Sequence, residues 1–280
     1  MYPLSALFEA GTVYPTTTYR SKNVHHFTGI MWGVPVFCKV AWAGTLTEEV
    51  NTICVLNSLP PLADIIGCYL FAGTATGSRF MSNTRGATGH PFADDDPIDV
   101  IITEDFGETL AAYFRREAQT CTSDKELTLK TLKVLKGVFT ALLRLRRDGG
   151  IRHQDAKLDN MGIHQNKIVL IDYEFSSREG TPCRAANFIG WGGRSRFNEG
   201  SDIFDIHTTL EYVFAFCGNR YFSLHLLRTL RQTVLQRHDA PSTARNSEGH
   251  SSVYMIDASA AVPCSFEAAI KTIGALIDLA

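Results

Sequence analysis

The chain has 280 residues, of which 45% are hydrophobic and 20% charged, so it is long enough to bury a substantial core in one large domain or in two lobes. Its formal net charge of -2 argues against a surface that binds nucleic acid or anionic lipid, because such binding depends on clustered Lys and Arg. Its seven cysteines form no C-x-x-C pair, and it has neither a signal-peptide pattern nor a long apolar run, so we expect no membrane span and a location in the cytosol or nucleus, of the producing cell or of a host.

The first third of the chain is predicted to be rich in strands. The segments at 25–42 and 64–73 are biased toward β-branched and aromatic residues, which favours strands. Between them, apolar residues recur at helical spacing near Ile53, and Thr45 or Thr47 is the expected N-cap of this short helix. Residues 73–97 contain almost no large apolar side chains and are predicted to form an exposed loop.

The remainder is predicted to be mainly helical. A strand ending at Thr103 and a polar turn at 104–107 precede one helix, and a long amphipathic helix runs from Asp124 until two glycines end it near 150. Further helices are expected at 203–216 and 221–235, an exposed loop at 239–252, and a closing helix at 265–280. These patterns predict an α+β fold.

Two polar clusters follow the long helix, in "IRHQDAKLDNMGI" and at the end of "KIVLID". Phosphoryl transfer needs a carboxylate to orient the attacking hydroxyl, oxygen ligands for Mg²⁺ and a cation for the developing charge. Asp155, Asn160, Asp172 and Lys157 supply these groups. The D-x-x-x-x-N spacing fits a loop that turns Asp155 and Asn160 toward one point, and the following strand brings Asp172 to it.

These segments resemble the H-R-D-x-K-x-x-N catalytic loop and the D-F-G turn of protein kinases. The resemblance implies that Asp155 accepts the substrate hydroxyl proton, that Lys157 supports the transferred phosphate, and that Asn160 and Asp172 bind Mg²⁺. His153 is then a structural residue packed beneath the metal-binding turn. The implied fold is two-lobed, with a strand-rich nucleotide-binding lobe at 1–106 and a helical catalytic lobe at 107–280, and the implied cofactors are ATP and Mg²⁺.

Upstream residues extend the resemblance. Lys39 resembles the strand lysine of V-A-I-K that contacts the α- and β-phosphates, and Glu49 resembles its ion-pair partner, with Glu48 as a rival. The segment "VIITEDFGETL" resembles the kinase hinge, which implies that the backbone of Glu104 and Phe106 contacts adenine.

The chain also departs from the kinase pattern. Gln154 replaces the loop arginine that commonly receives a phosphorylated activation segment, and constitutive activity is one interpretation. The G-x-G-x-x-G pattern is missing, with Gly11 as at best a remnant, and no A-P-E is present. Glu174 stands where the third residue of the metal turn is usually glycine. Downstream, Asp202 resembles the helix-starting aspartate that ties back to the catalytic loop.

Three functions remain open on these residues. The first is a compact, divergent Ser/Thr protein kinase of viral or effector type that acts on protein substrates, because Lys157 follows Asp155 at the spacing of serine/threonine enzymes. The second is a small-molecule kinase, because "IDYEF" also resembles the metal turn of choline and aminoglycoside kinases, although those enzymes usually lack the loop lysine. The third is a pseudokinase scaffold, which the missing glycine-rich loop favours.

Overall fold

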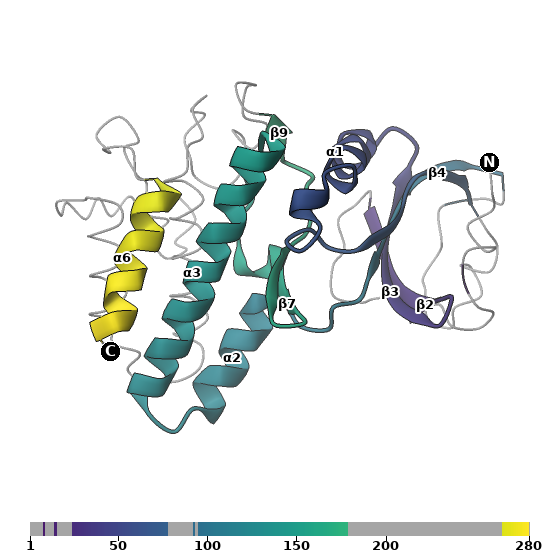
Figure 1. The fold of residues 1–280 in the computed structure, drawn as a ribbon. Coiled ribbons are helices and arrows are strands. Elements are labelled where there is room, and N and C mark those ends of the chain that lie inside the picture. The colour runs from purple at the N-terminus through teal and green to yellow at the C-terminus, as the bar shows by residue number, and fades with distance from the viewer. Residues whose placement is uncertain are drawn as a thin grey trace, which may run out of the picture. The chain divides into compact units, whose positions relative to one another are not determined.

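A computed structural model describes residues 8, 14–15, 24–77, 92, 95–178 and 265–279. Within these ranges the protein is a mixed α+β structure with an antiparallel sheet and four α-helices (Figure 1). The chain divides into two compact units, Met1–Gly107 and Glu108–Ala280. The binding and catalytic roles expected of 1–106 and 107–280 stay predictions.

The first unit is built on a five-stranded antiparallel sheet with the order β1-β2-β3-β5-β4. Its strands are β1 (Tyr14–Pro15), β2 (Val24–Met31), β3 (Val34–Trp42), β4 (Tyr69–Thr76) and β5 (Pro97–Glu104). A two-residue turn of Trp32 and Gly33 joins β2 to β3, and both residues have positive φ, 52° and 77°. Tight turns of this kind match the twist of the strands that they connect, so the predicted strand segment at 25–42 becomes a hairpin.

Helix α1 (Thr47–Asn57) follows β3 at the predicted place, but its predicted cap is wrong. The N-cap residue is Leu46, which has no side-chain hydrogen bond to the helix, so neither Thr45 nor Thr47 serves as the cap. The backbone N–H of Leu46 instead donates to the carboxylate of Asp99 on β5. A distant side chain therefore secures the start of this helix. A short 3₁₀ turn, Pro60–Leu62, leads on toward β4.

The loop predicted at 73–97 is shorter than expected, because β4 continues to Thr76 and β5 begins at Pro97. Residues 73–76 pair with residues 97–100 of β5. Glycine and alanine are poor strand formers, but a neighbouring strand supplies the backbone hydrogen bonds that hold this segment extended. Ala75 is also buried in the core of the unit. Most of the remaining predicted loop lies outside the described residues.

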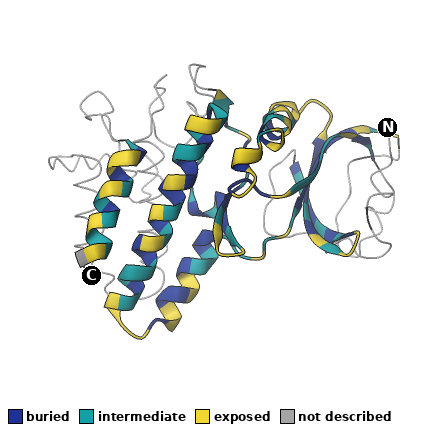
Figure 2. Cartoon of the chain, in the orientation of Figure 1, coloured by how far each residue is buried: buried dark blue, intermediate teal, exposed yellow. Residues whose placement is uncertain are grey.

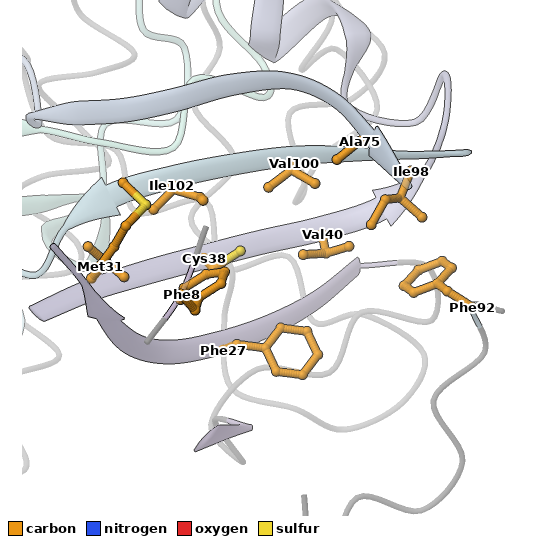
Figure 3. Packing of buried hydrophobic residues seen from close by; sticks show 11 residues of the cluster. Phe8, Phe27, Met31, Cys38, Val40, Ala75, Phe92, Ile98, Val100 and Ile102 are labelled. Carbon is orange, nitrogen blue, oxygen red and sulfur yellow. The ribbon is translucent and has the colours of Figure 1, made fainter. Parts of the chain in front are cut away.

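The hydrophobic core of the first unit lies on one face of the sheet (Figure 3). It is formed by Phe8, Phe27, Met31, Val36, Cys38, Val40, Ala75, Phe92, Ile98, Val100 and Ile102. Since side chains alternate between faces along a strand, Lys39 of β3 and Asp99 of β5 are on the opposite face. Burial raises the pKa of the Cys38 thiol, as expected for a cysteine that acts as a small hydrophobic residue.

The second unit begins with two capped helices. Helix α2 (Leu110–Thr120) is capped by Thr109, whose hydroxyl accepts from the N–H of Ala112 at 3.3 Å. Helix α3 (Asp124–Gly149) is capped by Ser123 and ends at Gly150, which is left-handed with φ 63°. These caps explain why the predicted long helix begins and ends where it does. Buried residues recur along α3 at helical spacing (Figure 2).

Short strands follow α3: β6 (Ile151–Arg152), β7 (Met161–His164), β8 (Lys167–Leu170) and β9 (Ser177–Arg178), with a 3₁₀ turn at Leu158–Asn160. The closing helix, α6 (Phe266–Leu279), packs against α3, and the rings of Phe139 and Phe266 stack at 6.2 Å. The helices predicted at 203–216 and 221–235 and the loop predicted at 239–252 lie outside the described residues. Of the helices that are described, none has the length and apolar character needed to cross a membrane.

Candidate active site

The second unit brings the two polar clusters together through a β-hairpin. Strands β7 and β8 pair antiparallel with Met161 opposite Leu170, and the N–H of Ile171 donates to the carbonyl of Asn160 at 3.0 Å. The pairing therefore continues one step beyond the strands, and Asp172 follows at the same open end of the hairpin. The hairpin occupies the residues between Asn160 and Asp172, so its length sets their spacing in the sequence.

The carboxylate of Asp155 is held in place through one oxygen. Its Oδ2 accepts from Nζ of Lys157 at 2.8 Å and from Nδ2 of Asn160 at 2.7 Å. Hydrogen bonds between charged groups are strong, so this oxygen is well anchored. The second oxygen, Oδ1, accepts no hydrogen bond from the described part of the chain, and the side chain of Asp155 is 20% exposed. One oxygen fixes the carboxylate and the other is left for a ligand.

Asn160 is oriented by the same contacts. Its Nδ2 donates to the backbone carbonyl of Asp155 at 3.0 Å as well as to the carboxylate. Both donor bonds fix which way the amide points, and among the described residues nothing donates to its Oδ1. An amide oxygen presented in this way is a suitable ligand for a hard cation such as Mg²⁺.

Two residues here have left-handed backbone that is uncommon outside glycine: Gln154 with φ 64° and Asp172 with φ 63°. The side chain of Gln154 is buried and donates from Nε2 to Oγ of Ser177 at 2.6 Å. Strand β6, which ends two residues before Gln154, also pairs directly with β9, which carries Ser177. Strained backbone persists only when its surroundings hold it, and such residues cluster at functional sites.

His153 lies where the resemblance implies. Its buried ring contacts the residues on either side of Asp172: Nε2 is 3.0 Å from the carbonyl of Ile171, and the ring lies 5.1 Å from that of Tyr173. A carbonyl only accepts, so Nε2 carries the proton of the neutral ring. Burial lowers the pKa of His153, and the opposing attraction of the Asp155 and Asp172 carboxylates does not reverse this. The neutral imidazole is the form that fits the fold.

This lowered pKa predicts acid sensitivity. Below its ordinary value of 6.5 the histidine of the unfolded chain takes up a proton that folded His153 does not, so the free energy of unfolding falls as the pH decreases. The slope from this group is at most about 1.4 kcal/mol per pH unit. Urea unfolding of the wild type and of His153→Gln is compared between about pH 7.5, where the unfolded histidine is mostly neutral, and about pH 5.5, where it is mostly protonated. The difference between the two proteins isolates the effect of His153, because the contributions of the other histidines cancel. Equal pH dependence in the two proteins would contradict this prediction.

Lys39 and Glu49 form a buried ion pair in the first unit. Nζ of Lys39 lies 2.7 Å from Oε2 of Glu49, and the two side chains are 11% and 3% exposed. Lys39 is fixed by β3, where it stands opposite Ile101 of β5 and His26 of β2. Glu48, the rival partner, is exposed. The ammonium is therefore held at a defined position above the sheet, on the face opposite the hydrophobic core.

The hinge-like segment includes the end of β5, up to Glu104, and the residues that follow it. The N–H of Glu104 donates to the carbonyl of Cys68 at 2.8 Å, so this N–H is not available to a ligand. The N–H of Asp105 donates to the carbonyl of Pro35 at 2.9 Å. Phe106 is half-buried, and its N–H donates to no described residue. Contact of Glu104 and Phe106 with adenine stays a prediction.

The structure thus forms two groups of the expected residues, each within one unit. Lys39 and Glu49 are one group, and the residues at 155–172 are the other. Gly11 and Asp202 lie outside the described residues. The resemblance did not point to Asp99 or to Ser177, which act through contacts with segments distant in sequence. No protein-family model matches the chain, and no curated protein is detectably similar to it.

Proposed function

We propose that the protein is an ATP- and Mg²⁺-dependent phosphotransferase with a two-lobed protein kinase-like fold, and that it phosphorylates Ser and Thr hydroxyls of protein substrates. The observation that carries the proposal is the carboxylate of Asp155, anchored through Oδ2 by Lys157 and Asn160 with Oδ1 left for a ligand. A strand lysine paired with a helix glutamate, and the left-handed backbone at Asp172, support it further.

Asp155 acts on the attacking hydroxyl. Its Oδ1 accepts the hydrogen bond of the substrate hydroxyl and then its proton, while Oδ2 stays bound to Lys157 and Asn160. The contact with Oδ2 keeps the ammonium of Lys157 beside the reacting groups, where it stabilises the negative charge of the transferred phosphate. These residues position the substrate hydroxyl and neutralise the negative charge of the phosphate. Positioning and charge neutralisation are the contributions that phosphoryl transfer requires most.

Asn160 and Asp172 are the residues that would hold Mg²⁺. Within the described residues no group of three or more His, Cys, Asp or Glu side chains could hold a metal ion. Nucleotide-bound Mg²⁺ usually needs only one or two carboxylate or amide ligands, because phosphates and waters complete its shell. The oriented Oδ1 of Asn160 and the carboxylate of Asp172 fit this requirement. Bound there, Mg²⁺ would neutralise charge on the phosphates.

The Lys39–Glu49 pair holds the ammonium of Lys39 in a fixed position before ATP binds, ready to contact its phosphates. Glu49 keeps the ammonium in one direction, so less conformational freedom is lost when a nucleotide binds. A buried charge whose partner is removed is strongly destabilising, whereas replacing both partners with apolar residues is close to neutral. This asymmetry allows the functional role of Lys39 to be separated from its role in stability.

We expect Lys39→Met to lower the free energy of unfolding by about 3 kcal/mol, because it leaves Glu49 buried without its partner. We expect the rate of transfer to fall about 100-fold. The double variant Lys39→Met/Glu49→Leu should recover most of the stability in urea unfolding and none of the activity. Recovery of activity together with stability would show that Lys39 has only a structural role.

A protein substrate is favoured over a small molecule by Lys157, whose ammonium contacts the proposed catalytic carboxylate at 2.8 Å. The purified protein should be incubated with labelled ATP and Mg²⁺, alone, with a generic basic protein, and with choline or an aminoglycoside. The proposal predicts label on Ser or Thr of protein. Label on the small molecule would assign the second function, and no label with any acceptor would favour a pseudokinase scaffold.

A further inference from the structure

A buried carboxylate lies beside the start of the helix that carries Glu49. Asp99 of β5 is 4% exposed and stands opposite Ala41 of β3, on the same face of the sheet as Lys39. Its neighbours along β5, Ile98 and Val100, belong to the hydrophobic core on the other face. Burying a carboxylate is unfavourable unless hydrogen bonds compensate for the lost water, so the contacts of Asp99 indicate its role.

Those contacts are made with the turn that leads into α1. Oδ2 of Asp99 accepts from the N–H of Gly44 and from the N–H of Leu46, both at 2.9 Å. Oδ1 lies 3.4 Å from the hydroxyl of Thr74 on β4. Gly44 has φ 92°, a conformation that side chains rarely adopt, so this turn is sharply defined.

The start of α1 depends on this carboxylate because Leu46, at the N-cap, cannot cap the helix with its own side chain. A helix begins with backbone N–H groups that lack partners, and it carries partial positive charge there. The negative charge of Asp99 next to this end is favourable. Asp99 thereby anchors the N-terminal end of α1 to β5.

Glu49 lies in the first turn of α1, directly after this point. Its place relative to the sheet is therefore set by where the helix begins, whereas the place of Lys39 is set by β3. Because β3 and β5 are adjacent strands, Asp99 holds the helix that carries Glu49 next to the strand that carries Lys39. Removing the carboxylate leaves the buried N–H of Leu46 and the N–H of Gly44 without their acceptor, and frees the start of the helix.

We propose that Asp99 is a positioning residue for the Lys39–Glu49 pair, and that it acts by fixing the start of α1 to β5; its consequence for phosphate transfer rests on the proposed function. Among the described residues, the side chain of Asp99 forms no hydrogen bond with Lys39 or Glu49. Its effect is indirect, and small displacements of a positioned group can cost about 100-fold in rate.

The experiment compares three substitutions in the full chain. Asp99→Ala removes both acceptor oxygens. Asp99→Asn is the conservative variant, because its amide oxygen can accept from Gly44 and Leu46 while its Nδ2 faces the hydroxyl of Thr74. Val100→Ala is the matched control, because it destabilises the same strand from the opposite face. Melting temperatures are measured for each protein, so that changes in stability are known.

The first measurement is the rate at which acetic anhydride acetylates Lys39, read by mass spectrometry of peptides. It needs no enzymatic activity. Asp99→Ala is expected to raise this rate at least about fivefold, because local opening of the pair exposes the amine. Asp99→Asn and Val100→Ala should stay within about twofold of the wild type. An equal increase in Asp99→Ala and Val100→Ala would overturn the proposal.

The second measurement is kcat/KM for ATP, in the wild type and in a Glu49→Gln background. Asp99→Ala should lower kcat/KM at least about tenfold in the wild type and less than about twofold in Glu49→Gln, while the loss of melting temperature is the same in both. An equal loss of kcat/KM in both backgrounds would overturn the proposed route through Glu49. A wild type without transfer activity would overturn the proposed function, and the acetylation rates would still decide whether Asp99 positions the pair.

Discussion

Asp172→Ala is expected to abolish Mg²⁺-dependent transfer, with a loss of roughly 1,000-fold or more, because the variant lacks the carboxylate proposed to hold the metal. Alanine is also strained at the left-handed backbone of Asp172, whereas asparagine tolerates it. Asp172→Asn should therefore have little effect on the fold, but its neutral amide binds Mg²⁺ more weakly than the carboxylate, so transfer should be slower and require a higher Mg²⁺ concentration. The measurement is the initial rate of transfer as a function of Mg²⁺ concentration, with circular dichroism to check folding.

Glu174→Gln is the matched control for this experiment, since it changes an exposed carboxylate close to Asp172. We expect it to keep the rate within about twofold, as is usual for exposed positions away from a site. If Asp172→Asn kept the wild-type rate and Mg²⁺ dependence, Asp172 would not be a metal ligand. A large loss in Glu174→Gln would instead favour the small-molecule kinase alternative, in which this acidic residue belongs to the metal turn.

Asp155→Asn is expected to lower the rate of transfer about 1,000-fold without unfolding the protein. The amide oxygen of asparagine can take the place of Oδ2 and accept from Lys157 and Asn160, but its nitrogen stands where Oδ1 would accept the substrate proton. The KM for ATP should change little, because this carboxylate is proposed to act on the hydroxyl. Steady-state kinetics with a protein substrate measures both quantities.

Asp159→Asn provides the control for this substitution, because it makes the same chemical change in the 3₁₀ turn that follows Asp155. Its rate should remain within about twofold of the wild type. An Asp155→Asn protein with the wild-type rate would remove the proposed base, and the enzyme function with it. Equal losses in the two variants would show that the turn tolerates no change of charge and that Asp155 has no special role.

Much of the local structure could be predicted because its causes are local. The long helix at 124–149 has its apolar spacing, its serine cap and its terminal glycine within its own sequence. Of the hairpin that brings Asn160 near Asp172, only the second strand was predicted, because "KIVLID" is an apolar run with strand character. The Lys39–Glu49 contact came from a family resemblance, and periodicity alone does not distinguish Glu49 from Glu48.

The features that were missed depend on residues far apart in sequence. The cap of α1 was placed on Thr45 or Thr47 because capping is usually local, but the carboxylate that holds this helix start belongs to Asp99, 53 positions after Leu46. Residues 73–76 were assigned to a loop because composition does not show the strand that pairs with them. The contact of Gln154 with Ser177 likewise spans 23 positions.

The central claim is that Asn160 and Asp172 share one metal ion beside the carboxylate of Asp155. A crystal structure of the protein with Mg²⁺ and a non-hydrolysable ATP analogue tests it most directly. We predict that the Oδ1 of Asn160 and the carboxylate of Asp172 coordinate the same Mg²⁺, with Oδ1 of Asp155 facing the terminal phosphate. Nucleotide bound elsewhere, or an Asp172 carboxylate turned away from the metal, would contradict the account.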